Sequence, residues 1–123
     1  MKFMLDANVL ILLLNLEPTV TRRASECFAG ELCVSAIAYA EVVRGSAGGK
    51  APSLEVIDRA IEGIEIVAFD VAAAQKYVDV PFARHRFDRL IAAHALALDL
   101  TLVTANLRDF RDVDGLRIED WTQ

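Results

Sequence analysis

Short, mostly apolar runs alternate with helix-forming stretches along the whole chain, and this alternation most constrains its fold. The runs expected to be strands are Phe3–Leu5, Leu32–Val34, Ile64–Phe69, Thr101–Val103 and, at an edge, Leu116–Ile118. Helices are expected at Val9–Leu16, Pro18–Gly30, Ser35–Arg44, Pro52–Ile61, 70–78 and Asp88–Leu98. Strands without polar alternation, each followed by a helix, predict an α/β sandwich around a parallel sheet.

Helix boundaries follow from capping and helix-breaking residues. Ser35 and Asp70 are good N-cap residues, and Pro18 suits the first turn of a helix. Gly30 is expected to end the helix that begins at Pro18, and the glycine-rich run 45–49 is expected to end the helix that begins at Ser35.

Length and composition predict one folded domain over residues 1–123. Hydrophobic residues make up 54% of the 123 residues, enough for a packed core and too many for a disordered chain. Asp6 interrupts the stretch that a signal peptide would need to be apolar, and no run is long enough to span a membrane. We therefore expect a cytoplasmic protein in which Cys27 and Cys33 are reduced, buried thiols.

The net charge of −5 argues against broad, non-specific binding of nucleic acid. The arginines are nevertheless clustered, at 22–23, 84–89 and 108–111. Arginine suits bidentate contacts with phosphate, so the pattern is compatible with a local basic rim around an acidic site.

Acidic residues stand where strands end or where helices are otherwise apolar. Asp6 directly follows the first strand, and Asn106 and Asp109 come just after the strand that ends at Val103. Glu41 lies among apolar neighbours, and Asp88 opens a helix. Each has an ordinary explanation when taken alone: a helix cap for Asp6 and Asp88, an ion pair for Glu41, and turn chemistry for the other two.

Taken together, the acids predict a metal site. In an open α/β sheet, ligands bind beyond the carboxyl ends of the strands, where these side chains are expected to meet. Clustered carboxylates repel one another unless a cation neutralises them, and an all-oxygen set selects a hard ion such as Mg²⁺ or Mn²⁺. Such sites typically hydrolyse phosphate esters.

Four segments, in this order, resemble the motifs of PIN-domain ribonucleases. They are Leu5–Ile11, Ser35–Glu41, Phe87–Ala95 and Leu102–Phe110. Their order and spacing, with the final Glu119-Asp120-Trp121, resemble the VapC toxins of bacterial type II toxin–antitoxin systems. The similarity extends over essentially the whole chain.

The resemblance implies a three-layer PIN-like sandwich with strand order 3-2-1-4-5 and a Mg²⁺-dependent endoribonuclease, with Mn²⁺ as a substitute ion. Such an enzyme cuts RNA and stops translation, and a VapB-like antitoxin neutralises it. The enzyme is expected to form a homodimer and, with the antitoxin, a hetero-oligomer. By motif position, Asp6 and Asp88 would be the main metal ligands, with Glu41 binding directly or through water. Asp109 would be the fourth acid, with Asn106 as the alternative.

Three arginines near these acids are expected to bind RNA rather than to take part in the chemistry. Arg86 and Arg89 flank Asp88, and Arg44 follows Glu41 by three residues. Phe82 and Phe87 are expected to pack, with base stacking beside Arg86 as the alternative; His85 is expected to face solvent and His94 to lie in the core or an interface.

Other functions remain open from the sequence. A non-catalytic PIN-like module would bind a protein partner through the same acids, and an RNA-processing PIN nuclease would work without an antitoxin. A haloacid-dehalogenase-type enzyme is disfavoured, because its pattern needs a second Asp two residues after the first, where this chain has Asn8.

Overall fold

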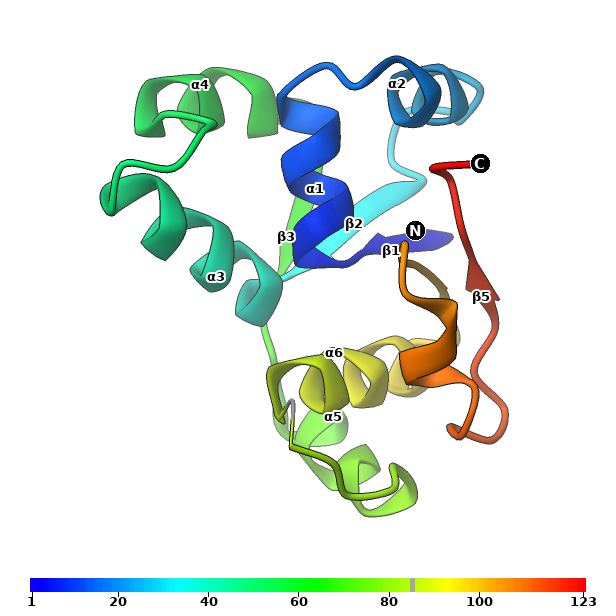
Figure 1. Cartoon of the computed structure of the whole chain (residues 1–123). Coiled ribbons are helices and arrows are strands. Elements are labelled where there is room, and N and C mark those ends of the chain that lie inside the picture. Colours follow the sequence, from blue (N-terminus) through cyan, green and yellow to red (C-terminus); the bar gives the residue numbers. More distant parts are fainter. Residues whose placement is uncertain (85) are drawn as a thin grey trace.

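A parallel sheet forms the centre of the computed structural model, which describes residues 1–84 and 86–123 (Figure 1). Within these residues the sheet has five strands in the order β3-β2-β1-β4-β5, as expected. The strands are β1 Phe3–Leu5, β2 Leu32–Ser35, β3 Glu65–Val67, β4 Thr101–Val103 and β5 Ile118–Glu119. All neighbouring strands are parallel.

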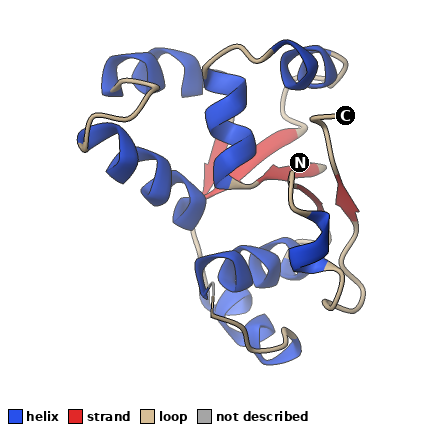
Figure 2. Cartoon of the chain, in the orientation of Figure 1, coloured by secondary structure: helices blue, strands red, loops and turns tan. Residues whose placement is uncertain are grey.

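Helices cover both faces of the sheet (Figure 2). The helices α1 to α4 lie on one side; they are Ala7–Leu14, Pro18–Ser25, Ala36–Ala47 and Leu54–Ala60. On the other side α5, Val71–Lys76, packs along α6, Arg86–Ala97. Three 3₁₀ turns complete the described part of the chain: η1 Ile61–Gly63, η2 Tyr77–Asp79 and η3 Leu107–Phe110.

The core lies where the central strands meet α1 and α6. Met4 and Leu5 of β1 have no exposed surface, and neither do Ile91, Ala92 and Ala93 of α6. Burial on both faces explains why β1 carries no polar alternation. The three-layer arrangement predicted from the sequence is therefore confirmed.

Two helix ends differ from the expectation. Helix α2 ends at Ser25 rather than at Gly30: the next two backbone N–H groups, of Glu26 and Cys27, donate to carbonyls three residues back, so the α-helical pattern stops there. Helix α3 continues through Gly45 and ends at Ala47. Its break comes at Gly49, whose φ of 99° is in the left-handed region that glycine adopts without strain.

The register of the sheet places three polar residues at one edge. Leu5 pairs with Val34 on one side and with Val103 on the other. The next residue of each segment, which is Asp6, Ser35 and Thr104, therefore lies at the carboxyl end of the three central strands. All three are buried.

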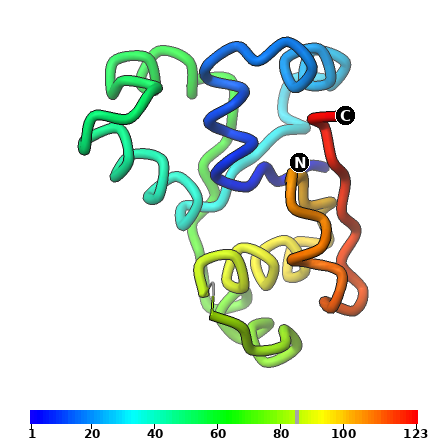
Figure 3. The backbone as a smooth tube through the Cα atoms, in the orientation of Figure 1, coloured from blue at the N-terminus to red at the C-terminus, as the bar shows by residue number. Residues whose placement is uncertain are grey.

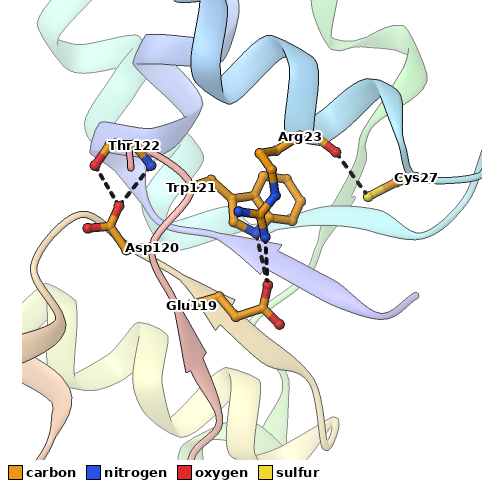
Figure 4. A network of polar contacts seen from close by, with 6 residues as sticks. All are labelled: Arg23, Cys27, Glu119, Asp120, Trp121 and Thr122. Carbon is orange, nitrogen blue, oxygen red and sulfur yellow. Dashed lines mark hydrogen bonds and ion pairs between the residues drawn. The ribbon is translucent and has the colours of Figure 1, made fainter.

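The C-terminal segment returns to α2, so that residues near the two ends of the chain lie side by side (Figure 3). Trp121 is 1% exposed and meets Phe3 edge-on, with 5.1 Å between ring centroids. Its indole N–H donates to Glu119 at 3.0 Å, and Arg23 reaches the same carboxylate oxygen at 3.4 Å (Figure 4). This aromatic and ionic contact attaches β5 to the first layer of helices.

Both cysteines are free thiols, as expected. Cys33 is fully buried in β2, and burial raises its pKa to about 11. Cys27 is only half-buried and contacts the Arg23 carbonyl (Figure 4). Within the described residues, no helix is both long and apolar enough to cross the hydrocarbon layer of a membrane.

Candidate active site

Asp6 is a buried carboxylate at the end of β1. Its backbone N–H donates to the Val103 carbonyl at 3.0 Å, which continues the pairing of β1 with β4. Its side chain caps α1 by accepting the Val9 N–H at 2.8 Å and also accepts a hydrogen bond from Thr104. The capping role considered from the sequence is real. It leaves the charge 6% exposed, and burial raises the pKa of this carboxyl.

Two helices bring further acids to Asp6. Glu41 is the sixth residue of α3, and Asp88 is the third residue of α6, in its first turn and not at its N-cap. Burial raises the pKa of Glu41, and the charges of Asp88 and Asp6 raise it further. Asp88 also raises the pKa of Asp6, although burial is the larger cause. The three carboxylates are therefore close enough for their charges to repel one another.

A cavity of about 710 Å³ opens beside this cluster, and the buried Asp6 is not among the residues that line it. Glu41 and Asp88 line it, and Asn106 and Asp109 form another part of its wall. Both Asn106 and Asp109 are exposed, at the entrance to η3 and within it. The structure thus brings both candidates for the fourth position to the same cavity.

The donor set suits a hard divalent cation. One carboxylate oxygen of Glu41, Oε1, is buried and has no hydrogen-bond partner among residues 1–84 and 86–123. A buried carboxylate oxygen without a donor is costly, and a cation is the partner that would relieve it. Within the described residues, no three His, Cys, Asp or Glu side chains are close enough to hold one ion directly. Water is therefore expected to complete the coordination, as is usual for Mg²⁺.

The cavity has a basic and aromatic side. Arg84, Arg86 and Phe87 line it, and the Arg86 guanidinium lies 5.9 Å from the centroid of the Phe82 ring. Phe82 is 77% exposed and Phe87 59%, so neither packs into the core. Arg44 is exposed in the last turn of α3. His85, expected to face solvent, lies outside the described residues.

Arg89 is not placed as expected. It is 5% exposed, and its Nη1 donates to both carboxylate oxygens of Asp112, at 3.0 and 3.1 Å. It also donates to the backbone carbonyls of Asp109 and Pro81. A guanidinium buried in these contacts is not available to a phosphate, so we no longer expect Arg89 to bind RNA. It ties α6 to η3, through the Asp109 carbonyl, and to Pro81 and Asp112 instead.

Sequence reasoning missed several residues of the site. Thr104 follows β4 as Asp6 follows β1, and this shared position is the signal in the sequence that could have identified it. Asn8 and Arg84 line the cavity without a distinctive pattern in the sequence. His94, buried as expected, contacts the Ser35 hydroxyl at 2.8 Å through Nδ1. This contact joins α6 to the start of α3, the two helices that carry Asp88 and Glu41.

The PIN domain family model matches residues 3–116 of the chain. The chain is 34% identical to the tRNA(fMet)-specific endonuclease VapC of Shigella flexneri, over 99% of both chains. It is 30% identical to the ribonuclease VapC2 of Haemophilus influenzae strain KW20, over 98% of both chains.

Solved structures agree with this similarity. A VapBC2 complex from Rickettsia felis, bound to a fragment of promoter DNA, superposes with a TM-score of 0.87 and 25% identity, over 98% of this chain and 99% of that chain. A DNA-bound VapBC from Salmonella typhimurium gives a TM-score of 0.86 and 32% identity, over 98% of both chains.

Proposed function

The chain belongs to the PIN-domain family, and from this membership we propose that it is a Mg²⁺-dependent endoribonuclease of the VapC type. It hydrolyses RNA phosphodiester bonds, which inhibits translation, and a VapB-like antitoxin neutralises it. The curated relatives are named VapC ribonucleases or endonucleases, and the similar structures are VapBC complexes, which supports this proposal.

The observation that carries the proposal is the unpartnered oxygen of Glu41 beside two other carboxylates. Burial and mutual repulsion raise the pKa values of Asp6 and Glu41, so the cluster is unfavourable in the absence of a cation. A structural role alone does not explain why three acids share this environment. A site that binds a divalent cation and a phosphodiester does explain it.

Asp6 and Asp88 would hold Mg²⁺, with Mn²⁺ as a substitute, and Glu41 would bind it directly or through water. When bound, the cation supplies charge neutralisation for the phosphate and makes a water molecule more acidic. Thr104 and the Val9 N–H keep the Asp6 carboxylate in one orientation by donating to it. Glu41 would accept a proton from the attacking water, because its Oε1 has no hydrogen-bond donor among the described residues.

The exposed side of the cavity would bind the substrate. Arg84 and Arg86 offer guanidinium groups to the RNA phosphates, and Phe87 offers an exposed ring for base stacking. Arg44 is a further candidate for phosphate contact. Either Asp109 or Asn106, which line the same cavity, would complete the acidic site.

We further propose that residues 1–123 act as one domain, in the cytoplasm where the RNA substrates are, and that the chain forms a homodimer and a hetero-oligomer with its antitoxin. The whole-chain similarity to proteins solved as VapBC complexes supports these partners.

Cleavage of cellular RNA with Mg²⁺ and with EDTA tests the function. Cleavage should require the cation and should leave 3′-hydroxyl and 5′-phosphate ends, because water attacks phosphorus. Asp88→Asn should abolish it, whereas Asp58→Asn, which removes an exposed acid from α4, should not. Full activity in excess EDTA, or ends bearing 2′,3′-cyclic phosphate, would contradict the mechanism. A folded chain that never cleaves RNA would instead support a non-catalytic module.

A further inference from the structure

A second hollow adjoins the acidic cavity on the side of η3. It has a volume of about 460 Å³ and is lined mainly by residues 105–111. Asn106 and Asp109 belong to the walls of both cavities, so the two are neighbours along one surface. A ligand that extends beyond the acidic cavity in this direction enters the second hollow.

The second hollow carries two arginines whose charges are not neutralised. Arg108 and Arg111 line it, both are exposed, and neither forms an ion pair with a described residue. Three arginines of the described residues do form ion pairs: Arg23 with Glu119, Arg89 with Asp112 and Arg117 with Asp99. Unpaired guanidinium groups in a hollow are suited to an anion with several oxygen atoms.

One acid of this hollow, Asp120, already accepts hydrogen bonds from within the chain. Asp120 accepts hydrogen bonds from both the backbone N–H, at 2.8 Å, and the hydroxyl of Thr122 (Figure 4). Both donors reach the same oxygen, Oδ1, and partly offset its negative charge. The other acid, Asp109, lies on the boundary with the acidic cavity.

The acidic cavity therefore has basic residues of its own and adjoins a second basic region. Arg84 and Arg86 line the acidic cavity, and Arg108 and Arg111 line the adjoining hollow, with which it shares Asn106 and Asp109. A polyanion with evenly spaced phosphates matches this arrangement, since its central phosphate would meet the cation site and its flanking phosphates would meet arginines. A single small anion would occupy only one of these regions.

We propose that the hollow lined by Arg108 and Arg111 is a second phosphate-binding subsite for single-stranded RNA. The strand passes from Arg84 and Arg86, over the carboxylates, to Arg108 and Arg111. This inference rests on the proposed ribonuclease function and assigns the substrate contacts on the two sides of the scissile bond.

Binding of a labelled RNA of about 12 nucleotides, long enough to fill both cavities, tests the subsite in EDTA over a range of salt concentrations. Arg108→Ala and Arg111→Ala should each weaken binding about fivefold and make the log–log salt slope less negative by about 0.7. Arg59→Ala is the matched control, because it removes an equally exposed arginine from α4, which lines neither cavity. It should leave affinity and slope unchanged.

Neutral methylphosphonate linkages then assign each arginine to one side of the mapped cleavage position. Neutralising the phosphates on one side should abolish the effect of Arg111→Ala but not that of Arg86→Ala, and neutralising the other side should do the reverse. The subsite would be refuted if the Arg108 and Arg111 variants bound RNA as tightly as Arg59→Ala does. It would also be refuted if neutral linkages on the same side abolished the effects of both Arg111→Ala and Arg86→Ala. Failure of the wild-type chain to cleave RNA with Mg²⁺ would refute the ribonuclease function separately.

Discussion

Asp6 has two roles whose requirements conflict. As the N-cap of α1 it needs only an oxygen that accepts the Val9 N–H, and asparagine would supply one. As a cation ligand it must be charged, although it is 6% exposed and lies near the Asp88 carboxylate. The charge therefore lowers the stability of the metal-free fold.

Asp6→Asn should stabilise the metal-free protein at neutral pH by about 1 kcal/mol, or about 4 °C in Tm, while abolishing cleavage. Because burial raises the pKa of Asp6, the folded chain holds this proton up to a higher pH than the unfolded chain. The contribution of the protonated Asp6 carboxyl to the free energy of unfolding is fully present below its pKa in the unfolded chain. It is lost as the pH rises through its higher pKa in the folded chain. Thermal unfolding in EDTA from pH 4 to 8 measures this, and the variant should lose stability less steeply as pH rises.

Asp70→Asn is the matched control for this prediction. Asp70 caps α5 by accepting the Ala73 N–H at 3.0 Å, but it is exposed. Removing its charge should give no comparable gain. Equal stabilisation by both substitutions would show that burial of the Asp6 charge is not the cause.

At the scale of elements, α6 presents consecutive residues to different partners. Asp88 lines the acidic cavity, while Arg89 points about 100° around the helix axis and bonds to Asp112 and to the Asp109 carbonyl. The helix thereby connects an acid of the site to η3, which carries Asp109 and Arg108. The correct position of one cavity wall depends on this buried arginine.

Arg89→Ala should destabilise the fold by about 2 kcal/mol, because it removes charge-assisted hydrogen bonds from a buried position. It should also lower kcat roughly tenfold through misplacement of η3. Arg89→Lys should recover little of either, since one ammonium nitrogen cannot replace both Nη1, which donates to Asp112, and Nη2, which donates to the Asp109 carbonyl. Denaturant unfolding and single-turnover cleavage measure the two effects.

Arg117→Ala supplies the comparison for Arg89. Arg117 also pairs with an aspartate, Asp99, at 3.0 Å, but the side chains of both members of this pair are largely exposed. Its loss should cost less than about 1 kcal/mol. The positioning role of Arg89 would be refuted if the two arginines proved equally important for stability and for kcat.

At the scale of the whole molecule, the acidic cavity and α1 offer a surface suited to inhibition. Carboxylates that bind a cation can also bind a guanidinium, which has fixed donors matched to their oxygens. Helix α1 leaves Ile11, Leu12 and Leu13 only half-buried, so apolar surface remains available to a partner.

An Arg-containing segment of the antitoxin should enter the cavity, pair with Asp6, Glu41 or Asp88, and exclude the metal. Adding purified antitoxin should abolish cleavage, and excess Mg²⁺ should partly restore it. Cleavage rates measured over a Mg²⁺ series, with full-length antitoxin and with antitoxin lacking its basic segment, check this. If the truncated antitoxin inhibited equally at every Mg²⁺ concentration, inhibition would be steric.

The sequence alone determined the features that depend on local patterns. Phe3–Leu5 and Thr101–Val103 are strands with the predicted bounds, because short apolar runs that end at polar residues have few other structures. The placement of acids after strands likewise predicted one edge for the site, since parallel strands end together.

The tertiary structure decided which partners the polar side chains have. Arg89 was expected to face RNA, but it pairs with Asp112, 23 residues away. Thr104 gained its role only through the register of β4 against β1, and Glu41 kept an unpartnered oxygen where an ion pair was the alternative. Hydrogen-bond partners distant in sequence depend on how layers pack, and that information is not contained in a local pattern.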